Sequence, residues 1–450
     1  MRARLAGWLD QARRPVDIAS LCAFRVLLGS LLAIAVVRHW SKGGIHDAFV
    51  VPKFFFPYWG FGWVQPLPGN GMYVVYAAIC ALAVLFALGL FYRASAIGLF
   101  LLFTYAHLCD AANYLNHYYL VSLLLGLSCF VPLHASFSLD ARRTPALRTS
   151  TVPAWVLTLF RFQIGLVYFF GGVAKLKADW LFRALPLRLW LAAAGDFPLL
   201  GPLLRWPEAP YVMSWVGAAF DLSAAFLLST RRTRPYAYAV VCVFHVMTAR
   251  LFQIGMFPWI MMASSLLFFE PSWPRAHLTR LGVRTATAAP ADETARIGPR
   301  LAGARLVALG AYVFVQLVLP LRHWLYPGPE LWTEQGYRFS WNVMLVEKTG
   351  SAELTVRDPA THATREVRLR EELTLLQVKM MATQPDMILA YARHLAQQAE
   401  ARGQPRPEVF ADVVVVLNGR SAARLVDEHV DLAAQEESLA SKRWILPAPR

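Results

Sequence analysis

A lysine lies at the end of a strongly apolar stretch, residues 160–180, which reads FRFQIGLVYFFGGVAKLKADW. The stretch is typical of a membrane-spanning helix, and Lys175 follows the small pair Gly171-Gly172 near its far end. A lysine at such a depth costs about 2.5–3.5 kcal/mol on insertion scales, so a chain that keeps one usually has a use for it. A buried lysine can give up its proton and act as a general base, whereas an arginine cannot. Lys175 is therefore the first candidate for chemistry.

Polar residues interrupt apolar stretches at three further places. These are Asn113, Asn116 and His117 in ANYLNHYYL, Asp221 in GAAFDLSAAF, and His245 in VFHVMTARLFQIGMFPWIMM. Each side chain is removed from water and needs a partner in low-dielectric surroundings. We expect these residues to converge with Lys175 on one cavity. The alternative is that they are satisfied hydrogen-bonding partners between helices, which is the commoner role of a buried histidine or asparagine.

The composition is that of a polytopic membrane protein. Of the 450 residues, 57% are hydrophobic and 16% are charged, against about 25% charged residues in soluble domains. The net charge of +15 does not indicate a nucleic-acid partner, because the basic residues are spread through short loops between apolar segments. The five cysteines all lie within apolar segments, so we expect neither a disulfide framework nor a metal site.

Nine apolar segments are long enough to span a membrane, or nearly so, at about 1.5 Å per residue. They are roughly 18–38, 72–91, 94–110, 115–134, 153–176, 210–229, 235–250, 253–270 and 302–321. Three of them are short and adjacent, so eight spans are an alternative. The basic N-terminus has no small-residue cleavage site, and basic residues concentrate in the even-numbered loops. We therefore expect a cytoplasmic N-terminus in a bacterial inner membrane, with Lys175 facing the periplasmic side.

Beyond residue 322 the pattern changes to that of a soluble domain. ELTVRD and TREVRLR are strand-like, PDMILAYARHLAQQAEARG is helical, and EVFADVVVVLNGRSAARLVD predicts a hairpin that turns at Asn418-Gly419. The predicted fold is mostly α: a polytopic transmembrane helical bundle of eight or nine helices over residues 1–322, followed by a small extramembrane α+β domain over 323–450, on the periplasmic side. We expect the aromatic loop 39–71 to lie at the membrane interface or over a cavity. We expect residues 271–300 to form a flexible loop.

Four sequence blocks together resemble the vitamin K-dependent γ-glutamyl carboxylase family, whose membrane part is also called the HTTM domain. The blocks are LNHYYL around His117, YFFGGVAKLKADW around Lys175, HVMTARLFQIGMFPW from His245, and LPLRHW followed by GYRFSWNVML from His323 to Leu345. They lie in the family's order and extend over roughly residues 18–345. The occurrence of all four blocks in one chain is specific to this family, whereas a single block would not be.

The resemblance implies an integral-membrane lyase with linked epoxidase activity. Such an enzyme couples the epoxidation of vitamin K hydroquinone by O2 to the carboxylation of glutamyl residues with CO2, which yields carboxyglutamate. The implied cofactor is reduced vitamin K, either phylloquinol or menaquinol, with O2 and CO2 as co-substrates and no metal. The implied partners are the lipid bilayer, the quinol and a glutamate-containing peptide or protein.

The resemblance also implies roles for individual residues. Lys175 matches the base that deprotonates the hydroquinone, and Asn116 and His117 match the pair that holds a quinone oxygen. His245 and Met256 are the remaining candidates for contacts with the quinone, which requires an apolar groove between helices. The proposed glutamate-binding residues are those in the last block, His323, Tyr337 and Trp341.

The chain departs from the animal enzymes at several points. Its outer domain is small and has no cysteine, Ala174 stands where those enzymes have a second lysine, and Arg338 interrupts the last block as GYRFSW. Two other functions are therefore kept open. A quinol oxidase or epoxidase without a protein substrate would use Lys175 but would not need Tyr337. A non-enzymatic transporter or scaffold would line a solute path with the buried polar groups.

Overall fold

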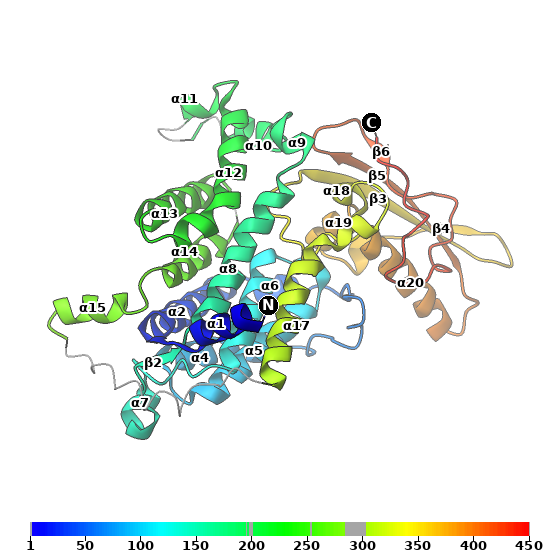
Figure 1. Cartoon of the computed structure of the whole chain (residues 1–450). Coiled ribbons are helices and arrows are strands. Elements are labelled where there is room, and N and C mark those ends of the chain that lie inside the picture. The colour runs from blue at the N-terminus through cyan, green and yellow to red at the C-terminus, as the bar shows by residue number, and fades with distance from the viewer. Residues whose placement is uncertain (1, 195, 198–200, 253, 284–302, 450) are drawn as a thin grey trace.

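The computed structural model describes residues 2–194, 196–197, 201–252, 254–283 and 303–449 (Figure 1). In these ranges a helix lies in each of the nine predicted apolar segments. These helices are α2 (Ala19–Ser41), α4 (Gly71–Leu88), α5 (Tyr92–Leu108), α6 (Asn116–Cys129), α8 (Ala154–Ala174), α12 (Ala209–Ser229), α13 (Arg234–Leu251), α14 (Phe257–Ser265) and α17 (Ala304–Val318). Among the described residues, five helical stretches are long and apolar enough to cross a membrane: Ala19–Ser41, Gly71–Leu88, Ala154–Ala174, Ala209–Ser229 and Ala304–Leu325.

Helix α8 lies in the middle of the bundle. Its apolar window is 72% buried, whereas that of Ala304–Leu325 is only 11% buried. Close packing against α12 depends on Gly172, since a Cβ there would lie 2.7 Å from the backbone nitrogen of Leu222. In the first half of α8, Arg161 donates hydrogen bonds to the carbonyl oxygens of Leu267 (2.7 Å) and Phe269 (2.9 Å). A partly buried cation is thereby satisfied by backbone oxygens.

The C-terminal region forms a four-stranded antiparallel sheet in the order β4-β3-β5-β6. Its strands are β3 (Lys348–Arg357), β4 (Thr364–Glu366), β5 (Glu408–Leu417) and β6 (Ala423–Arg424), and its main helices are α19 (Leu375–Met381) and α20 (Pro385–Ala401). The turn predicted at Asn418-Gly419 follows β5, with left-handed φ angles of 51° and 72°. The prediction of a mostly helical membrane bundle with a small strand-containing C-terminal region is confirmed.

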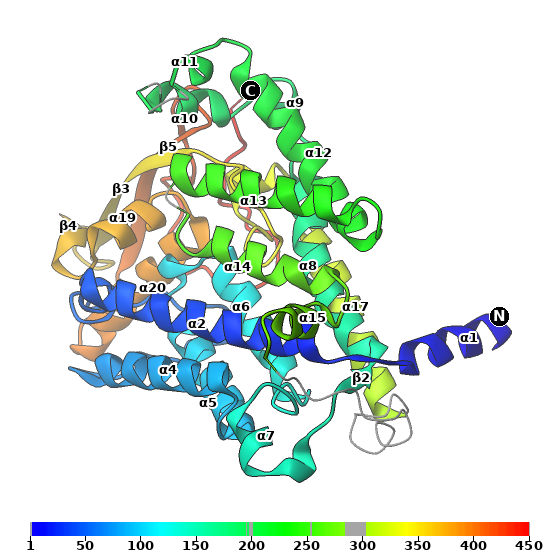
Figure 2. The same ribbon diagram turned by 90° about the vertical axis from the view of Figure 1, so that its left-hand side faces the viewer.

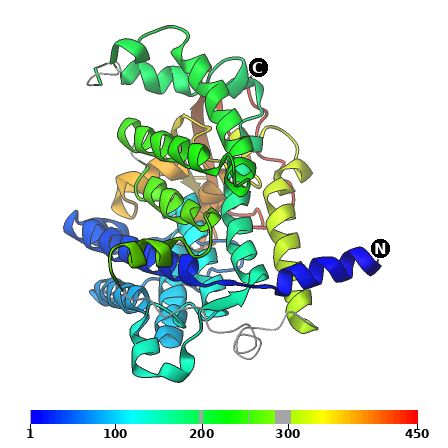
Figure 3. The ribbon, with the colours of Figure 1, turned by 60° about the vertical axis from the view of Figure 1, so that its left-hand side comes forward.

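Short elements connect the larger ones. They are α1 (Arg2–Arg13), α3 (Gly44–Phe49), η1 (Ala111–Asn113), α7 (Leu139–Arg143), η2 (Pro145–Leu147), α9 (Ala178–Leu181), α10 (Leu187–Ala193), α11 (Gly201–Leu204), η3 (Leu266–Phe268), α15 (Trp273–Arg280), η4 (Leu319–Leu325), α18 (Glu330–Thr333), η5 (Leu369–Glu371) and the paired strands β1 (Pro15–Asp17) and β2 (Thr151–Pro153). Figure 3 shows α1 projecting away from the bundle.

The prediction of a loop over 271–300 is wrong at its start, where α15 forms. Pro274 occupies the first turn of this helix, where a proline costs no hydrogen bond. The guanidinium of Arg275 then pairs with the Asp17 carboxylate at 2.9 and 3.2 Å. Residues 284–302 of the predicted loop lie outside the described residues.

The aromatic loop 39–71 lies between the bundle and the C-terminal region. The Phe56 side chain is fully buried, and the Phe54 ring lies 5.5 Å from that of Tyr391 on α20. The Gln377 side chain on α19 donates to the Phe54 carbonyl oxygen (2.8 Å) and to Asp110 (2.9 Å), just after α5. These contacts hold the sheet and its helices against one end of the bundle. Figure 1 shows the sheet, α19 and α20 together on one side of the molecule, and Figure 2 shows α13, α14, α2 and α4 lying roughly parallel in the bundle.

Candidate active site

Lys175 directly follows the last turn of α8, and its side chain is buried against α12. Its Nζ lies 2.8 Å from Oδ2 of Asp221, in the middle of α12. The same amine donates to the carbonyl oxygens of Gly171 (3.2 Å) and Val343 (3.5 Å). The Trp180 ring lies 5.2 Å from this nitrogen. An ammonium and a carboxylate removed from water compensate each other's desolvation cost, so the pair is stable where either charge alone would not be.

The Lys175 amine opens onto a cavity of about 180 Å³ between α8, α12, α13 and α14. In the same measure a single water needs only about 10–15 Å³, so the cavity has room for a group of several atoms. Most of its wall is apolar, and it includes Val167, Leu187, Met213, Val216, Phe244, Met247, Phe252, Phe257, Met261, Val343 and Met344. Water and ions are disfavoured in such surroundings, which strengthens the electrostatic interactions of the few polar groups present.

The polar part of the cavity wall includes His245 and Tyr168. The Tyr168 hydroxyl lies 3.0 Å from Nε2 of His245 and 3.1 Å from Oγ of Ser265. The other imidazole nitrogen of His245, Nδ1, is buried and has no hydrogen-bond partner among the described residues. A buried polar atom without a partner costs about 1–3 kcal/mol, so it indicates a position where a ligand's polar atom completes the bonding.

His117 does not line the cavity of Lys175. Together with Met256 it lines a second pocket beside α2, and the Phe257 ring lies 6.1 Å from His117 and 6.0 Å from His245. The expectation that all intramembrane polar residues meet in one cavity is therefore wrong for Asn113, Asn116 and His117, none of which lines the Lys175 cavity. The helical pattern around His117 does not specify which of two adjacent interhelical spaces this residue faces.

Asn116 is bonded to the segment that follows the last span. Its Nδ2 donates to the carbonyl oxygen of Asn342 (2.9 Å), and its Oδ1 accepts from the Tyr114 hydroxyl (3.0 Å). Asn342 immediately precedes Val343, whose carbonyl oxygen accepts a hydrogen bond from the Lys175 amine. Asn116 thus helps to place the backbone that contacts Lys175.

The three predicted glutamate-site residues lie on or next to the segment 334–345. Trp341 is fully buried and its ring stacks on Tyr119 at 5.0 Å. Burial raises the pKa of the half-buried Tyr337 phenol. Nδ1 of His323 lies 2.9 Å from the Pro320 carbonyl oxygen. Each of these side chains is ordered by contacts within the protein.

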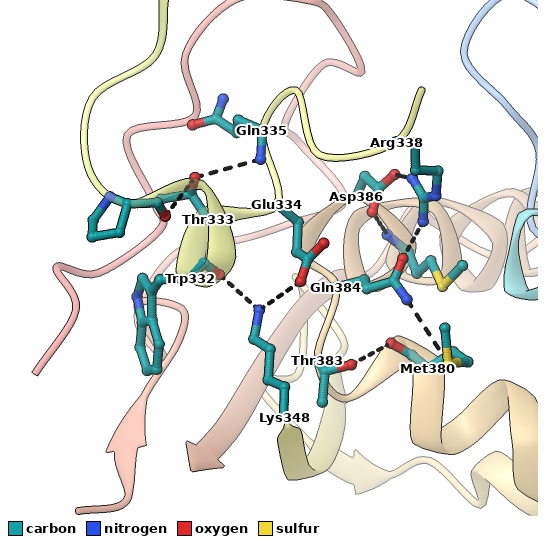
Figure 4. A network of polar contacts seen from close by, with 12 residues as sticks. Trp332, Thr333, Glu334, Gln335, Arg338, Lys348, Met380, Thr383, Gln384 and Asp386 are labelled. Carbon is teal, nitrogen blue, oxygen red and sulfur yellow. Dashed lines mark hydrogen bonds and ion pairs between the residues drawn. The ribbon is translucent and has the colours of Figure 1, made fainter. Parts of the chain in front are cut away.

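Two ion pairs hold the start of this segment on the outer domain (Figure 4). The Lys348 amine lies 3.1 Å from Glu334 and donates to the Trp332 carbonyl oxygen at 2.8 Å. Arg338 binds both Asp386 and the Gln384 side chain. Burial raises the pKa of Glu334 and lowers that of Lys348, and each partner's charge opposes that shift.

The backbone of the same segment is strained. The φ angles are 58° at Glu334, 62° at Phe339, 58° at Trp341 and 56° at Met344. A left-handed φ angle at a non-glycine residue costs about 1–3 kcal/mol. Such a conformation persists only where surrounding contacts enforce it, often at functional sites. Here the strained chain carries Val343 and Met344 into the wall of the Lys175 cavity.

Sequence reasoning missed two features of this site. Tyr168 precedes Lys175 by seven residues and so shares its face of α8, which is the signal that could have identified it. The contributions of Val343 and Met344 had no signal in the sequence pattern, because they depend on how the chain returns from the outer domain to the bundle.

These features define an integral-membrane protein with a buried amine above an apolar cavity and a small outer domain. Comparison with known families places residues 13–273 in the HTTM domain family, and residues 302–450 match the lumenal domain of vitamin K-dependent gamma-carboxylase. The chain belongs to the vitamin K-dependent gamma-carboxylase family. No solved structure was found to match it.

Proposed function

We propose that this protein is a γ-glutamyl carboxylase that uses reduced vitamin K, O2 and CO2, with Lys175 as its general base. Family membership supports a carboxylase-like membrane enzyme. The observation that carries the assignment of the base is the buried Lys175 amine, which opens onto a mostly apolar cavity.

The residues of the cavity fit a quinol head group. Its apolar wall suits a fused ring, and Nδ1 of His245 offers a hydrogen bond to a ring oxygen. When bound, reduced vitamin K supplies, on oxidation by O2, the strong base that removes a proton from the γ-carbon of a glutamyl side chain, to which CO2 then adds.

The chain's own groups would prepare this chemistry. Lys175, as a neutral amine, accepts a proton at Nζ from a hydroxyl in the cavity. The carboxylate of Asp221 compensates the ammonium that results, and the carbonyl oxygens of Gly171 and Val343 accept its N–H groups. Tyr168 fixes the ring of His245 through the bond to Nε2.

The glutamyl side chain would approach from the outer domain. Tyr337 and Trp341 precede the two residues that enter the cavity wall, Val343 and Met344, so a substrate held at this segment lies next to the cavity. In this proposal His117 and Met256 act from the neighbouring pocket, in contact with an extended part of the quinol. The outer domain and Lys175 face the periplasm, and the N-terminus lies in the cytoplasm, in agreement with the distribution of basic loops.

The test uses the purified full chain with vitamin K hydroquinone, O2, 14C-labelled bicarbonate and a glutamyl peptide. We expect labelled peptide and vitamin K epoxide with the wild type, and at least a hundredfold lower rate of both with Lys175→Ala, since general bases typically contribute about 10²–10⁴-fold. Lys177→Ala is the matched control, because Lys177 pairs with Glu330 outside the cavity. Full epoxidation by Lys175→Ala would refute the base, and epoxide without labelled peptide would identify a quinol epoxidase instead.

A further inference from the structure

The stretch of chain that follows Lys175 connects this residue to the outer domain. It contains α9 and α10, which Figure 1 shows at the end of the bundle nearest to β5 and β6. Trp180 and Leu187 from this stretch line the Lys175 cavity. The position of this part of the cavity wall therefore depends on what holds α9 and α10 in place.

Arg420, in the turn between β5 and β6, binds the carboxylate of Asp179 at the start of α9. Its two terminal nitrogens donate to the two oxygens of Asp179 at 2.6 and 2.8 Å, and Nδ2 of Asn418 donates to one of them at 3.2 Å. The side chains of Asp179 and Arg420 are only 15% and 21% exposed. An arginine that binds both oxygens of a carboxylate fixes the orientation of the pair as well as its distance. The pair therefore holds α9 on the sheet of the outer domain.

Asp179 directly precedes Trp180, whose buried ring lies beside the Lys175 amine. The centre of the ring is 5.2 Å from Nζ of Lys175, and Nε1 of Trp180 donates to the Ser214 carbonyl oxygen on α12 at 2.8 Å. An indole face within about 6 Å of an ammonium attracts it, most strongly where water is excluded. The Trp180 ring therefore stabilises the ammonium that forms when the Lys175 amine accepts a proton.

Two further contacts join the same stretch to the outer domain. Nε1 of Trp190 donates to the Glu347 carboxylate, directly before β3, at 2.6 Å. The Trp190 ring also lies 5.4 Å from that of Phe252 in the cavity wall. Gly419 lies against Leu189, where an added Cβ would be 3.4 Å from the leucine side chain. The outer domain thus contacts both α9 and α10, and the contact nearest to Lys175 in the sequence is the ion pair of Arg420.

We propose that Arg420 and Asp179 are positioning residues for the reaction, and that they act on Lys175 through Trp180. The inference rests on the proposed function, in which Lys175 is the base. Arg420 holds Asp179 on the outer domain, and Asp179 fixes α9 so that the Trp180 ring stays beside the amine. The outer domain then contributes to epoxidation itself, even when no glutamyl peptide is bound.

The first test measures hydrogen–deuterium exchange of the detergent-purified full chain without quinol, so it needs no turnover. Arg420→Ala should speed exchange at the hydrogen-bonded amides of Leu181 and Phe182 about tenfold and leave α8 unchanged, since only α9 loses its anchor. The matched control is Arg424→Ala, which removes an arginine whose ion pairs on the same sheet are partly exposed. Unchanged exchange in α9 of Arg420→Ala would overturn the proposal.

The second test measures epoxide formation without a peptide. Arg420→Ala should lower kcat about tenfold with KM for the hydroquinone nearly unchanged, and Arg420→Lys should recover part of the loss, because an ammonium can still bind Asp179. Trp180→Leu should lower kcat by a similar factor, and Arg420→Ala added to Trp180→Leu should lower it little further.

Effects of Arg420→Ala and Trp180→Leu that multiply in the double variant would overturn the proposal, because Arg420 would then not act through Trp180. A wild type that forms no epoxide would refute the proposed function instead. The exchange measurement would still decide whether Arg420 holds α9 in place.

Discussion

At the scale of single residues, the pairing of Lys175 with Asp221 decides how the proposed base works. The carboxylate lies 2.8 Å from the amine in a buried site. It compensates the ammonium that forms when the amine accepts a proton. Asp221 therefore acts through Lys175 as a positioning residue, and its removal should lower the rate of the reaction more than it weakens binding of the hydroquinone.

We predict that Asp221→Asn lowers kcat for epoxide formation and leaves KM for the hydroquinone nearly unchanged. The amide carries no charge to compensate the ammonium that forms during the reaction, whereas the apolar wall of the cavity is unchanged. The measurement is the steady-state rate of epoxide formation over a range of hydroquinone concentrations. Ser223→Ala, two residues away and partly exposed to solvent, serves as the control. A kcat equal to that of the wild type would contradict the assignment of Asp221.

At the scale of elements, the segment 334–345 connects the outer domain to the base. Glu334–Lys348 and Arg338–Asp386 hold one end on the outer domain, and the Val343 carbonyl oxygen reaches Lys175 at the other end. Four non-glycine residues of this segment have positive φ angles, so the surrounding contacts must hold it in place. The Glu334–Lys348 pair is the more deeply buried of the two anchors, with side chains 10% and 3% exposed.

We predict that Lys348→Met lowers the unfolding free energy by about 3–5 kcal/mol, because it leaves the Glu334 carboxylate buried without a cation. The double variant Lys348→Met/Glu334→Gln should recover most of this loss, since no buried charge then remains. The measurement is thermal unfolding of the detergent-solubilised protein. Lys379→Met changes an exposed lysine of the same domain and should have little effect. Equal stability of the single and double variants would show that the pair does not act as described.

At the scale of the whole molecule, Asp110 joins the bundle to the outer domain. Its carboxylate accepts hydrogen bonds from the Gln377 side chain on α19 (2.9 Å) and from the backbone nitrogen of Phe56 (3.2 Å). Burial raises the pKa of Asp110 from 3.8 to about 6, although these bonds oppose the shift. The junction between the two parts therefore has a group that titrates in weakly acidic solution.

We predict a pH-dependent stability from this group. Because its pKa is higher in the folded chain, its contribution to stability is complete below about pH 4 and is lost as the pH rises through about 6. The difference of about two pKa units corresponds to roughly 3 kcal/mol. Asp110→Asn should remove this component. The difference in unfolding midpoint between the wild type and the variant should therefore not be the same at pH 4 and at pH 7. Parallel curves across this range would contradict the prediction.

We also predict the orientation of the protein in a bacterial inner membrane. A cysteine placed at Thr361, in the exposed turn after β3, should react with an impermeant maleimide in intact cells. A cysteine at Thr144, next to Arg142 and Arg143, should react only after the cells are opened. The reverse result would invert the topology and place Lys175 on the cytoplasmic side.

The sequence by itself determined the helices, the class of membrane protein, the family and the strands of the outer domain. Apolar length and strand alternation are local properties, so α8, β5 and the Asn418-Gly419 turn could be recognised from short windows of residues. The polar residues worth attention were identified for a similar reason, because a charged side chain in an apolar stretch is costly wherever it lies.

Only the tertiary structure decided which of those residues meet. Lys175 meets Asp221 and the Val343 carbonyl oxygen, 46 and 168 positions away, whereas His117 faces a different space from His245. The physical reason is that lipid and neighbouring helices are equally apolar, so hydropathy does not specify which face of a helix turns toward which partner. That choice depends on close packing at small residues such as Gly172 and on the strained return of 334–345 to the bundle.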